Sequence, residues 1–168
     1  MKNNFHNQLK EEILRIRSLF YENFNKKSFE VEGDVKNPSG LKLRLVGDGE
    51  IGSIEIINFK DAWEIDYDIV KFYNDKDKYC ESNCDNDFFN GNNSVYLHSL
   101  IVEYNQRGLG YGKEIMKKCD EISKNMGYDY ILLITSCDNA VAQNMYRRLG
   151  YEIHQTDGKK DFFYKKLN

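Results

Sequence analysis

Apolar residues in the first part of the chain recur every three to four positions between residues 5 and 26, and charged residues fill the other face. This period predicts an amphipathic helix. Its apolar stripe consists of Phe5, Leu9, Ile13, Ile16, Leu19, Phe20 and Phe24. A loop with the single proline follows at 37–40.

The next apolar segments, 41–46 and 51–59, are typical of strands. Gly47-Asp48-Gly49 between them predicts a hairpin turn. Residues 60–73 fit two patterns. Trp63, Ile65, Tyr67 and Ile69 alternate as in a strand, while Ala62, Ile65, Ile69 and Phe72 suit a helix. We favour the strand, because β-branched and aromatic residues dominate. Residues 74–93 are polar and predict a long loop.

The second half alternates strands with helices. Residues 95–102 and 128–135 are largely apolar and predict buried strands. A glycine-rich turn precedes a helix over 110–125, which Gly127 ends. A short helix over 139–149 stops at Gly150. The segments 151–154 and 162–166 predict a closing pair of strands.

Composition narrows the class of protein. With 168 residues, 40% of them hydrophobic, the chain can form one domain with a full core. A net charge of −3 and a pI near 5.7 argue against nucleic acid as a partner. We expect no signal peptide and no membrane segment, hence a cytoplasmic protein with reduced cysteines. Cys80 and Cys84 lack a second ligand pair, so we expect no metal.

The turn between the first buried strand and the following helix is suited to binding phosphate. Helix N-termini present unpaired N–H groups, and glycines let the backbone approach a ligand. A P-loop would need Gly at position 107, where Arg stands. The dinucleotide fingerprint starting at Gly108 would need Gly at 113, where Lys stands. Both nucleotide motifs are therefore excluded.

The pattern that does fit is R-x-x-G-x-G, formed by Arg107, Gly110 and Gly112, with Val102 ending the strand before it. A second motif follows the next strand and consists of Asn139, Ala142, Tyr146, Leu149, Gly150 and Tyr151. Together they resemble the acetyl-CoA-dependent N-acetyltransferases of the GNAT superfamily. The resemblance covers residues 95–167.

This resemblance implies a single α/β (α+β) domain. Its mixed, mostly antiparallel sheet would have helices on both faces and a splayed parallel strand pair that admits CoA. Residues 95–168 would bind acetyl-CoA as cosubstrate, and the more variable residues 1–94 would bind the acceptor. The acceptor would be a small-molecule or peptide amine, and members of this kind often form homodimers.

The resemblance also assigns the cofactor contacts. Backbone groups of Leu100, Ile101 and Val102 would hold the pantetheine arm. The pyrophosphate would lie on backbone N–H groups of the loop formed by Arg107, Gly108, Leu109, Gly110, Tyr111, Gly112 and Lys113. Asn139 would hydrogen-bond the cofactor, and as an N-cap it would also stabilise its helix.

Two residues are candidates for catalysis. Tyr146 would protonate the departing CoA thiolate as a general acid, although it could also simply pack on the helix's buried face. His98 would share a face with Tyr96, Leu100 and Val102 if the strand is regular. An imidazole suits a general base at neutral pH, but a histidine on an apolar strand is equally often a core residue.

Glu64, Asp66 and Asp68 would line one face of the 60–73 segment, and we interpret them as a solvated polar face rather than as an acceptor site. The predicted reaction is direct attack of a primary amine on the acetyl group. Three alternatives remain open at this stage: acetylation of protein N-termini or lysines, a non-catalytic acyl-CoA-binding regulatory module, and an interaction domain without CoA affinity whose glycines only turn the chain.

Overall fold

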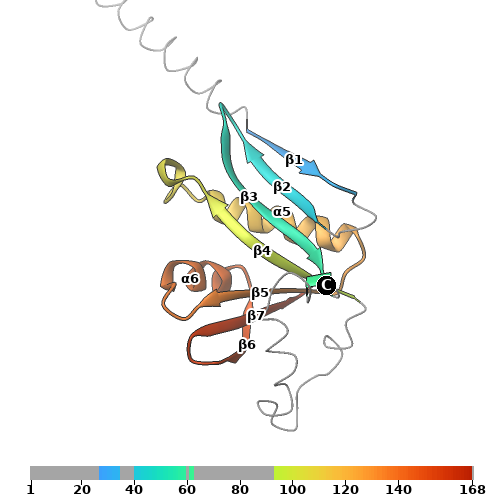
Figure 1. Cartoon of the computed structure of the whole chain (residues 1–168), viewed down its shortest axis with the longest axis vertical. Coiled ribbons are helices and arrows are strands. Elements are labelled where there is room, and N and C mark those ends of the chain that lie inside the picture. The colour runs from blue at the N-terminus through green and yellow to red at the C-terminus, as the bar shows by residue number, and fades with distance from the viewer. Residues whose placement is uncertain (1–26, 35–39, 60, 63–92, 168) are drawn as a thin grey trace, which may run out of the picture.

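The computed structural model describes residues 27–34, 40–59, 61–62 and 93–167. Within these ranges lie seven strands, a short 3₁₀ turn and two α-helices (Figure 1). The predicted helix at 5–26, the acidic positions 64, 66 and 68, the cysteines at 80 and 84, and the loop at 74–92 lie outside the described residues. The proposed division of the chain at residue 94 stays a prediction.

All seven strands form one sheet in the order β1-β2-β3-β4-β5-β7-β6. Only the β4–β5 pair is parallel. The strand bounds are β1 Ser28–Glu32, β2 Leu41–Val46, β3 Glu50–Asn58, β4 Ser94–Val102, β5 Tyr130–Ser136, β6 Glu152–Thr156 and β7 Lys160–Lys166. The mixed, mostly antiparallel sheet is therefore confirmed.

The hairpin expected at Gly47-Asp48-Gly49 joins β2 and β3. Strand β1 was not predicted. Its residues are mostly exposed, because it is an edge strand that pairs only with β2. Just after β3, Asp61 and Ala62 are helical. For these two residues the favoured strand is wrong, and the rest of the ambiguous segment lies outside the described residues.

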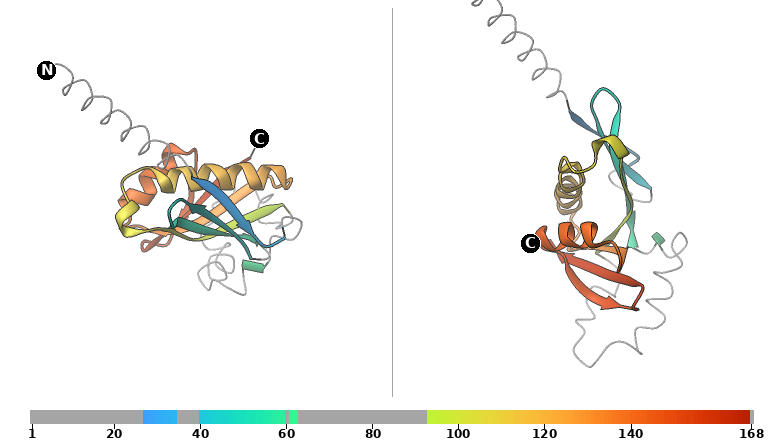
Figure 2. Two further views of the ribbon diagram at one scale, coloured as in Figure 1. Left: turned by 90° about the horizontal axis from the view of Figure 1, so that it is seen from above. Right: turned by 90° about the vertical axis from the view of Figure 1, so that its left-hand side faces the viewer.

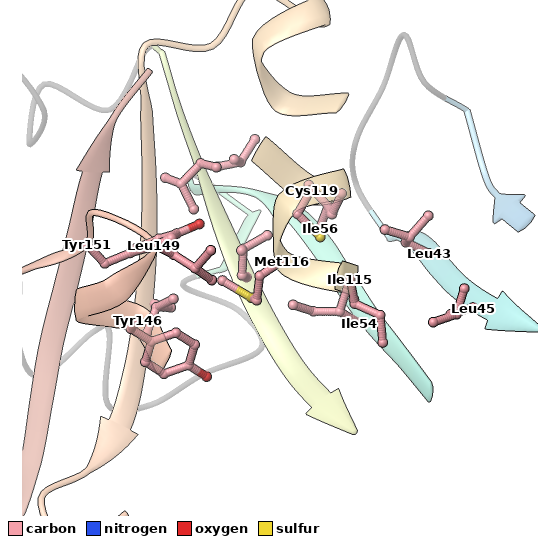
Figure 3. Close-up of a cluster of buried hydrophobic side chains, with 14 of the residues drawn as sticks. Leu43, Leu45, Ile54, Ile56, Ile115, Met116, Cys119, Tyr146, Leu149 and Tyr151 are labelled. Carbon is pink, nitrogen blue, oxygen red and sulfur yellow. The ribbon is translucent and has the colours of Figure 1, made fainter. Parts of the chain in front are cut away.

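Helices α5 (Tyr111–Asn125) and α6 (Ala140–Arg148) pack on the same face of the sheet (Figure 2). Both contribute to the larger core cluster, α5 with Ile115 and Met116 and α6 with Tyr146 (Figure 3). Burying one such aliphatic side chain contributes about 1.5–3 kcal/mol. The sequence predicts helices on both faces: α5 and α6 share one face, and the helical residues Phe59 and Ala62 pack in the cluster on the other.

The opposite face has a smaller core cluster of Ile57, Phe59, Ala62, Tyr96, Leu132 and Phe162. Where the central strands are regular, side chains alternate between the two clusters, as pleated backbone requires. In β5, for example, Ile131 and Leu133 face the helices, while Leu132 faces the other way. The sheet thus separates two differently packed sides of the molecule.

Candidate functional site

The parallel strands β4 and β5 form a fork. Their pairing ends at Leu97 and Leu133, but both strands continue, β4 along β3 and β5 along β7 (Figure 1). Leu100, Ile101 and Val102 therefore lie beyond the last β5 partner. The predicted splay of the parallel pair is confirmed.

A β-bulge in β4 lies just inside this fork. Between the pairs Ser53–Ile101 and Glu55–His98, β4 contains one residue more than β3. Ser99 has a φ of 55°, which is unusual for a non-glycine residue. The extra residue shifts the alternation of side chains along the strand.

The bulge corrects the prediction for His98. Leu100 and Val102 pack against the larger cluster on the helix face. His98 instead lies beside Tyr96, with ring centroids 6.0 Å apart, on the face of the smaller cluster. His98 therefore shares a face with Tyr96, but not with Leu100 and Val102, because the strand is not regular.

The glycine-rich loop connects β4 to α5 through a 3₁₀ turn at Tyr104–Gln106. The Arg107 Nε donates to the Val102 carbonyl oxygen at 3.0 Å, and its guanidinium lies over the Tyr104 ring. The Arg107 side chain thus braces the loop against the end of β4. Gly108 and Gly110 have φ values of 79° and 87°, which only glycine adopts readily.

Helix α5 begins at Tyr111 with Gly110 as its N-cap, which has no side chain to cap the helix. The first helical hydrogen bond of this turn runs from the Glu114 N–H to the Gly110 oxygen at 3.1 Å. The N–H groups of Tyr111, Gly112 and Lys113 precede it and lack intrahelical acceptors. Unpaired N–H groups and the helix dipole together favour an anion at this point.

The side chains around this helix start leave the backbone accessible. An added Cβ at Gly108 or Gly110 would meet no atom within 4 Å. The Tyr111 ring is buried in the core, and Leu109 is exposed, so the loop offers its backbone rather than these side chains. A Cβ at Gly112 would lie 3.3 Å from the Met145 Sδ, which shows how closely α5 approaches α6. The accessible backbone N–H groups at this helix start are suited to binding a diphosphate group.

Helix α6 begins differently, at Asn139. The Asn139 Oδ1 accepts a hydrogen bond from the Ala142 N–H at 3.1 Å, so its N-cap role is confirmed. Sequence analysis missed Gln143, which is buried and donates from Nε2 to the Ser136 and Cys137 carbonyl oxygens. These bonds fix the turn between β5 and α6. A glutamine on the apolar side of a short helix is the only sequence signal for it.

Tyr146 lies on the buried side of α6, with 7% of its surface exposed. Its ring lies 6.0 Å from the ring of Tyr151 (Figure 3). The ring of Phe163 lies 5.6 Å away. Burial raises the pKa of Tyr146 to about 12. None of the described residues forms a hydrogen bond with its hydroxyl, whereas the Tyr151 hydroxyl donates to the Asp120 Oδ1. The Tyr146 phenol is thus protonated, and its hydroxyl has no hydrogen-bond partner among the described residues.

Side chains that could bind a metal do not gather in the part of the chain that the structure describes. None of the helices in those ranges is long and apolar enough to cross a membrane. The candidate site combines the N–H groups at the start of α5, the β4–β5 fork, Asn139 at the start of α6 and Tyr146 on the helix face with His98 on the opposite face.

Comparison with known proteins agrees with this geometry. Residues 57–151 match the acetyltransferase (GNAT) family. A GNAT-family acetyltransferase from Staphylococcus aureus Mu50 has a similar structure, with a TM-score of 0.53 and 18% sequence identity. The match covers 78% of this chain and 70% of that protein.

Two further similar structures contain the cofactor. One is a streptothricin acetyltransferase, described as putative, from Bacillus anthracis in complex with acetyl-CoA (TM-score 0.53, 16% identity, 79% of this chain and 66% of that one). The other is the PaiA N-acetyltransferase from Thermoplasma acidophilum in complex with CoA (TM-score 0.51, 19% identity, 74% and 59%). At these identities the likeness establishes the fold, and the matched region spans 59–70% of the three proteins' length.

Proposed function

This chain belongs to the acetyltransferase (GNAT) family, and we propose that it transfers the acetyl group of acetyl-CoA to a primary amine. The observation that carries the proposal is the open start of α5 beside the β4–β5 fork. The N–H groups at the start of α5 form the candidate anion site. They follow the same end of β4 at which β4 and β5 no longer pair. The candidate anion site and the fork suit a ligand with a diphosphate at one end and an extended, uncharged arm.

Each part of the cosubstrate then has a candidate contact in the chain. The N–H groups of Tyr111, Gly112 and Lys113 bind the diphosphate. Backbone groups of 100–102 pair with the amide-containing arm in the manner of an added strand. The Asn139 Nδ2 remains available to the cofactor, because the cap uses only its Oδ1. The transferable acetyl group then lies in the fork.

Tyr146 acts as the general acid in this proposal. Its phenol keeps its proton at neutral pH, because burial raises its pKa to about 12. When the amine attacks the acetyl carbonyl, the carbon–sulfur bond breaks and the sulfur takes the electron pair. Tyr146 gives its proton to that sulfur and regains one from water. General acid catalysis of this kind contributes about 10²–10⁴-fold.

His98 is the candidate for accepting the proton that the amine must lose. The side chain is about one-third exposed, which suits exchange of protons with water. We propose a cytoplasmic enzyme whose acceptor is a small-molecule or peptide amine. No metal takes part in this scheme.

The test is calorimetric titration of acetyl-CoA into three proteins: the wild type, Gly110→Glu and Gly158→Glu. Gly158 is a matched control, because its φ of 83° is close to the 87° of Gly110 and its surroundings are equally open, but it lies in the β6–β7 turn. We expect micromolar binding by the wild type and by Gly158→Glu, and a loss of at least about 100-fold in Gly110→Glu.

A panel of primary amines, including peptides with free N-termini and lysines, then identifies the acceptor by release of CoA thiol. Equal acetyl-CoA binding by the two glycine variants would place the diphosphate elsewhere. Binding without transfer to any amine would instead indicate a regulatory module that holds acyl-CoA.

A further inference from the structure

Glu55 and His98 form a polar pair on the sheet face opposite to α5 and α6. They are direct cross-strand partners on β3 and β4. The Glu55 Oε2 lies 3.3 Å from the His98 Nδ1, and the Ser99 Oγ lies 2.8 Å from the same nitrogen. Two oxygen atoms thus converge on one nitrogen of the ring.

The Glu55–His98 pair lies where the β4–β5 fork begins. His98 is the first residue of β4 after Leu97, the last one to pair with β5. The Ser99 bulge comes immediately after it and turns Leu100 back to the helix face. Among the described non-glycine residues, only Ser99 has a positive φ. His98 therefore lies at the start of the fork, on the sheet face opposite to the Leu100 and Val102 side chains that follow the bulge.

We propose that Glu55 is a positioning residue for His98, which accepts the proton of the amine during acetyl transfer; this rests on the proposed function. With Nδ1 protonated and held by the Glu55 carboxylate and the Ser99 hydroxyl, the Nε2 lone pair is available. The amine's N–H bond breaks, its electron pair stays on nitrogen, and an N–H bond forms at Nε2. The resulting imidazolium lies beside a carboxylate and later returns its proton to water.

The distances distinguish this arrangement from a nucleophilic triad. A triad needs the serine oxygen on one ring nitrogen and the carboxylate on the other. Here the Ser99 Oγ is 2.8 Å from Nδ1 and 3.5 Å from Nε2, so serine and glutamate meet the same nitrogen. The group is therefore an oriented base, and Ser99 is not an activated nucleophile.

A kinetic test uses the full chain and the best amine from the panel above. We compare the wild type with Glu55→Gln, His98→Gln and the double variant. Glu50→Gln is the matched control, because Glu50 lies on the same strand, is 42% exposed against 41% for Glu55, and faces Arg44 instead of a histidine. All five proteins are measured for kcat and for both KM values.

We expect His98→Gln to lower kcat by about 10²–10⁴-fold and Glu55→Gln by about 10-fold, with the KM for acetyl-CoA unchanged. The double variant should be no slower than His98→Gln, since Glu55 acts only through His98. Glu50→Gln should match the wild type. The proposal would be overturned if Glu55→Gln lowered kcat by the same factor in the wild type and in the His98→Gln background. It would also be overturned if Glu55→Gln did not lower kcat at all.

A second measurement does not depend on turnover. Nitrogen NMR of the free protein, at a pH where the ring is neutral, should show His98 protonated at Nδ1, and Glu55→Gln should move the proton partly to Nε2. An Nε2-protonated ring in the wild type would overturn the proposal even in an active enzyme. A third outcome is a ring protonated at Nδ1 in a protein that acetylates no amine. That outcome would refute the proposed function and the role of His98 as a base, but it would leave the Glu55–His98 contact intact.

Discussion

The N-cap of helix α5 is Gly110, which has no side chain, whereas the N-cap of α6 is Asn139, whose Oδ1 accepts from the Ala142 N–H. Both helices follow a strand of the parallel pair, and both pack on the same face. The start of α5 leaves its first N–H groups available to a ligand. At the start of α6, the Asn139 side chain instead accepts from one of the first N–H groups of that helix.

The difference shows how two similar strand–helix connections can serve different purposes. At α5 no side chain caps the helix, and in our proposal its backbone N–H groups bind the cosubstrate. At α6 the Asn139 Oδ1 occupies one N–H group of the first turn, and in our proposal the helix contributes Tyr146 from its second turn. A glycine and an asparagine at the N-cap thus distinguish a helix start without a side-chain cap from one with such a cap, and only the uncapped start is our candidate anion site.

The largest expected effect tests what α6 contributes. Replacing Tyr146 by Phe removes the hydroxyl and keeps the ring contacts with Tyr151 and Phe163. We expect kcat to fall by about 10²–10⁴-fold, the range of general acid catalysis, with the acetyl-CoA Kd unchanged. Tyr164→Phe, on β7, is the control and should keep kcat. A normal kcat in Tyr146→Phe would show that α6 only packs.

The pKa of Tyr146 gives a second prediction at alkaline pH. Its folded value of about 12 exceeds the usual 10, so its stabilising effect is complete below pH 10 and is lost as the pH rises through 12. Between pH 9 and 11 the free energy of unfolding should fall by about 1 kcal/mol more in the wild type than in Tyr146→Phe. Chemical denaturation at pH 9, 10 and 11 measures the difference; parallel curves would contradict burial of the phenol.

A pair of substitutions at Asn139 separates the cap from cofactor binding. Asn139→Ala should lower the free energy of unfolding by about 1 kcal/mol, while Asn139→Ser keeps a capping oxygen and most of the stability. Both lack the Nδ2 donor, so both should weaken acetyl-CoA binding by about 3–10-fold. Chemical denaturation measures the free energy of unfolding, and calorimetric titration measures the Kd for acetyl-CoA. Normal binding in the serine variant would restrict Asn139 to its structural role.

Salt should produce the smallest effect and should act on only one helix start. Raising ionic strength from 0.05 to 0.5 M should weaken acetyl-CoA binding by about 2–5-fold, since the helix dipole contributes about 0.3–1 kcal/mol to anion binding. The stability difference between wild type and Asn139→Ala should not change with salt, because a neutral cap hydrogen bond is not screened. A salt-independent Kd would argue against an anion at α5.

Local signals in the sequence determined much of this protein. Glycine at 110 and 112, asparagine at 139 and the period of apolar residues predict the loop, the cap and the helices, because these features depend on neighbours within a few positions. The fork between the two parallel strands was implied only by the family resemblance that these motifs carry.

Contacts between distant segments were decided only by the tertiary structure. The alternation of residues 95–102 gives no sign of the bulge at Ser99, and that extra residue moves Leu100 and Val102 away from the face of His98. Glu55 becomes a partner of His98 only through the register of β3 against β4. The edge strand β1 and the shared face of α5 and α6 have the same cause: strand pairing and layer packing depend on residues far apart in the chain, which no local period encodes.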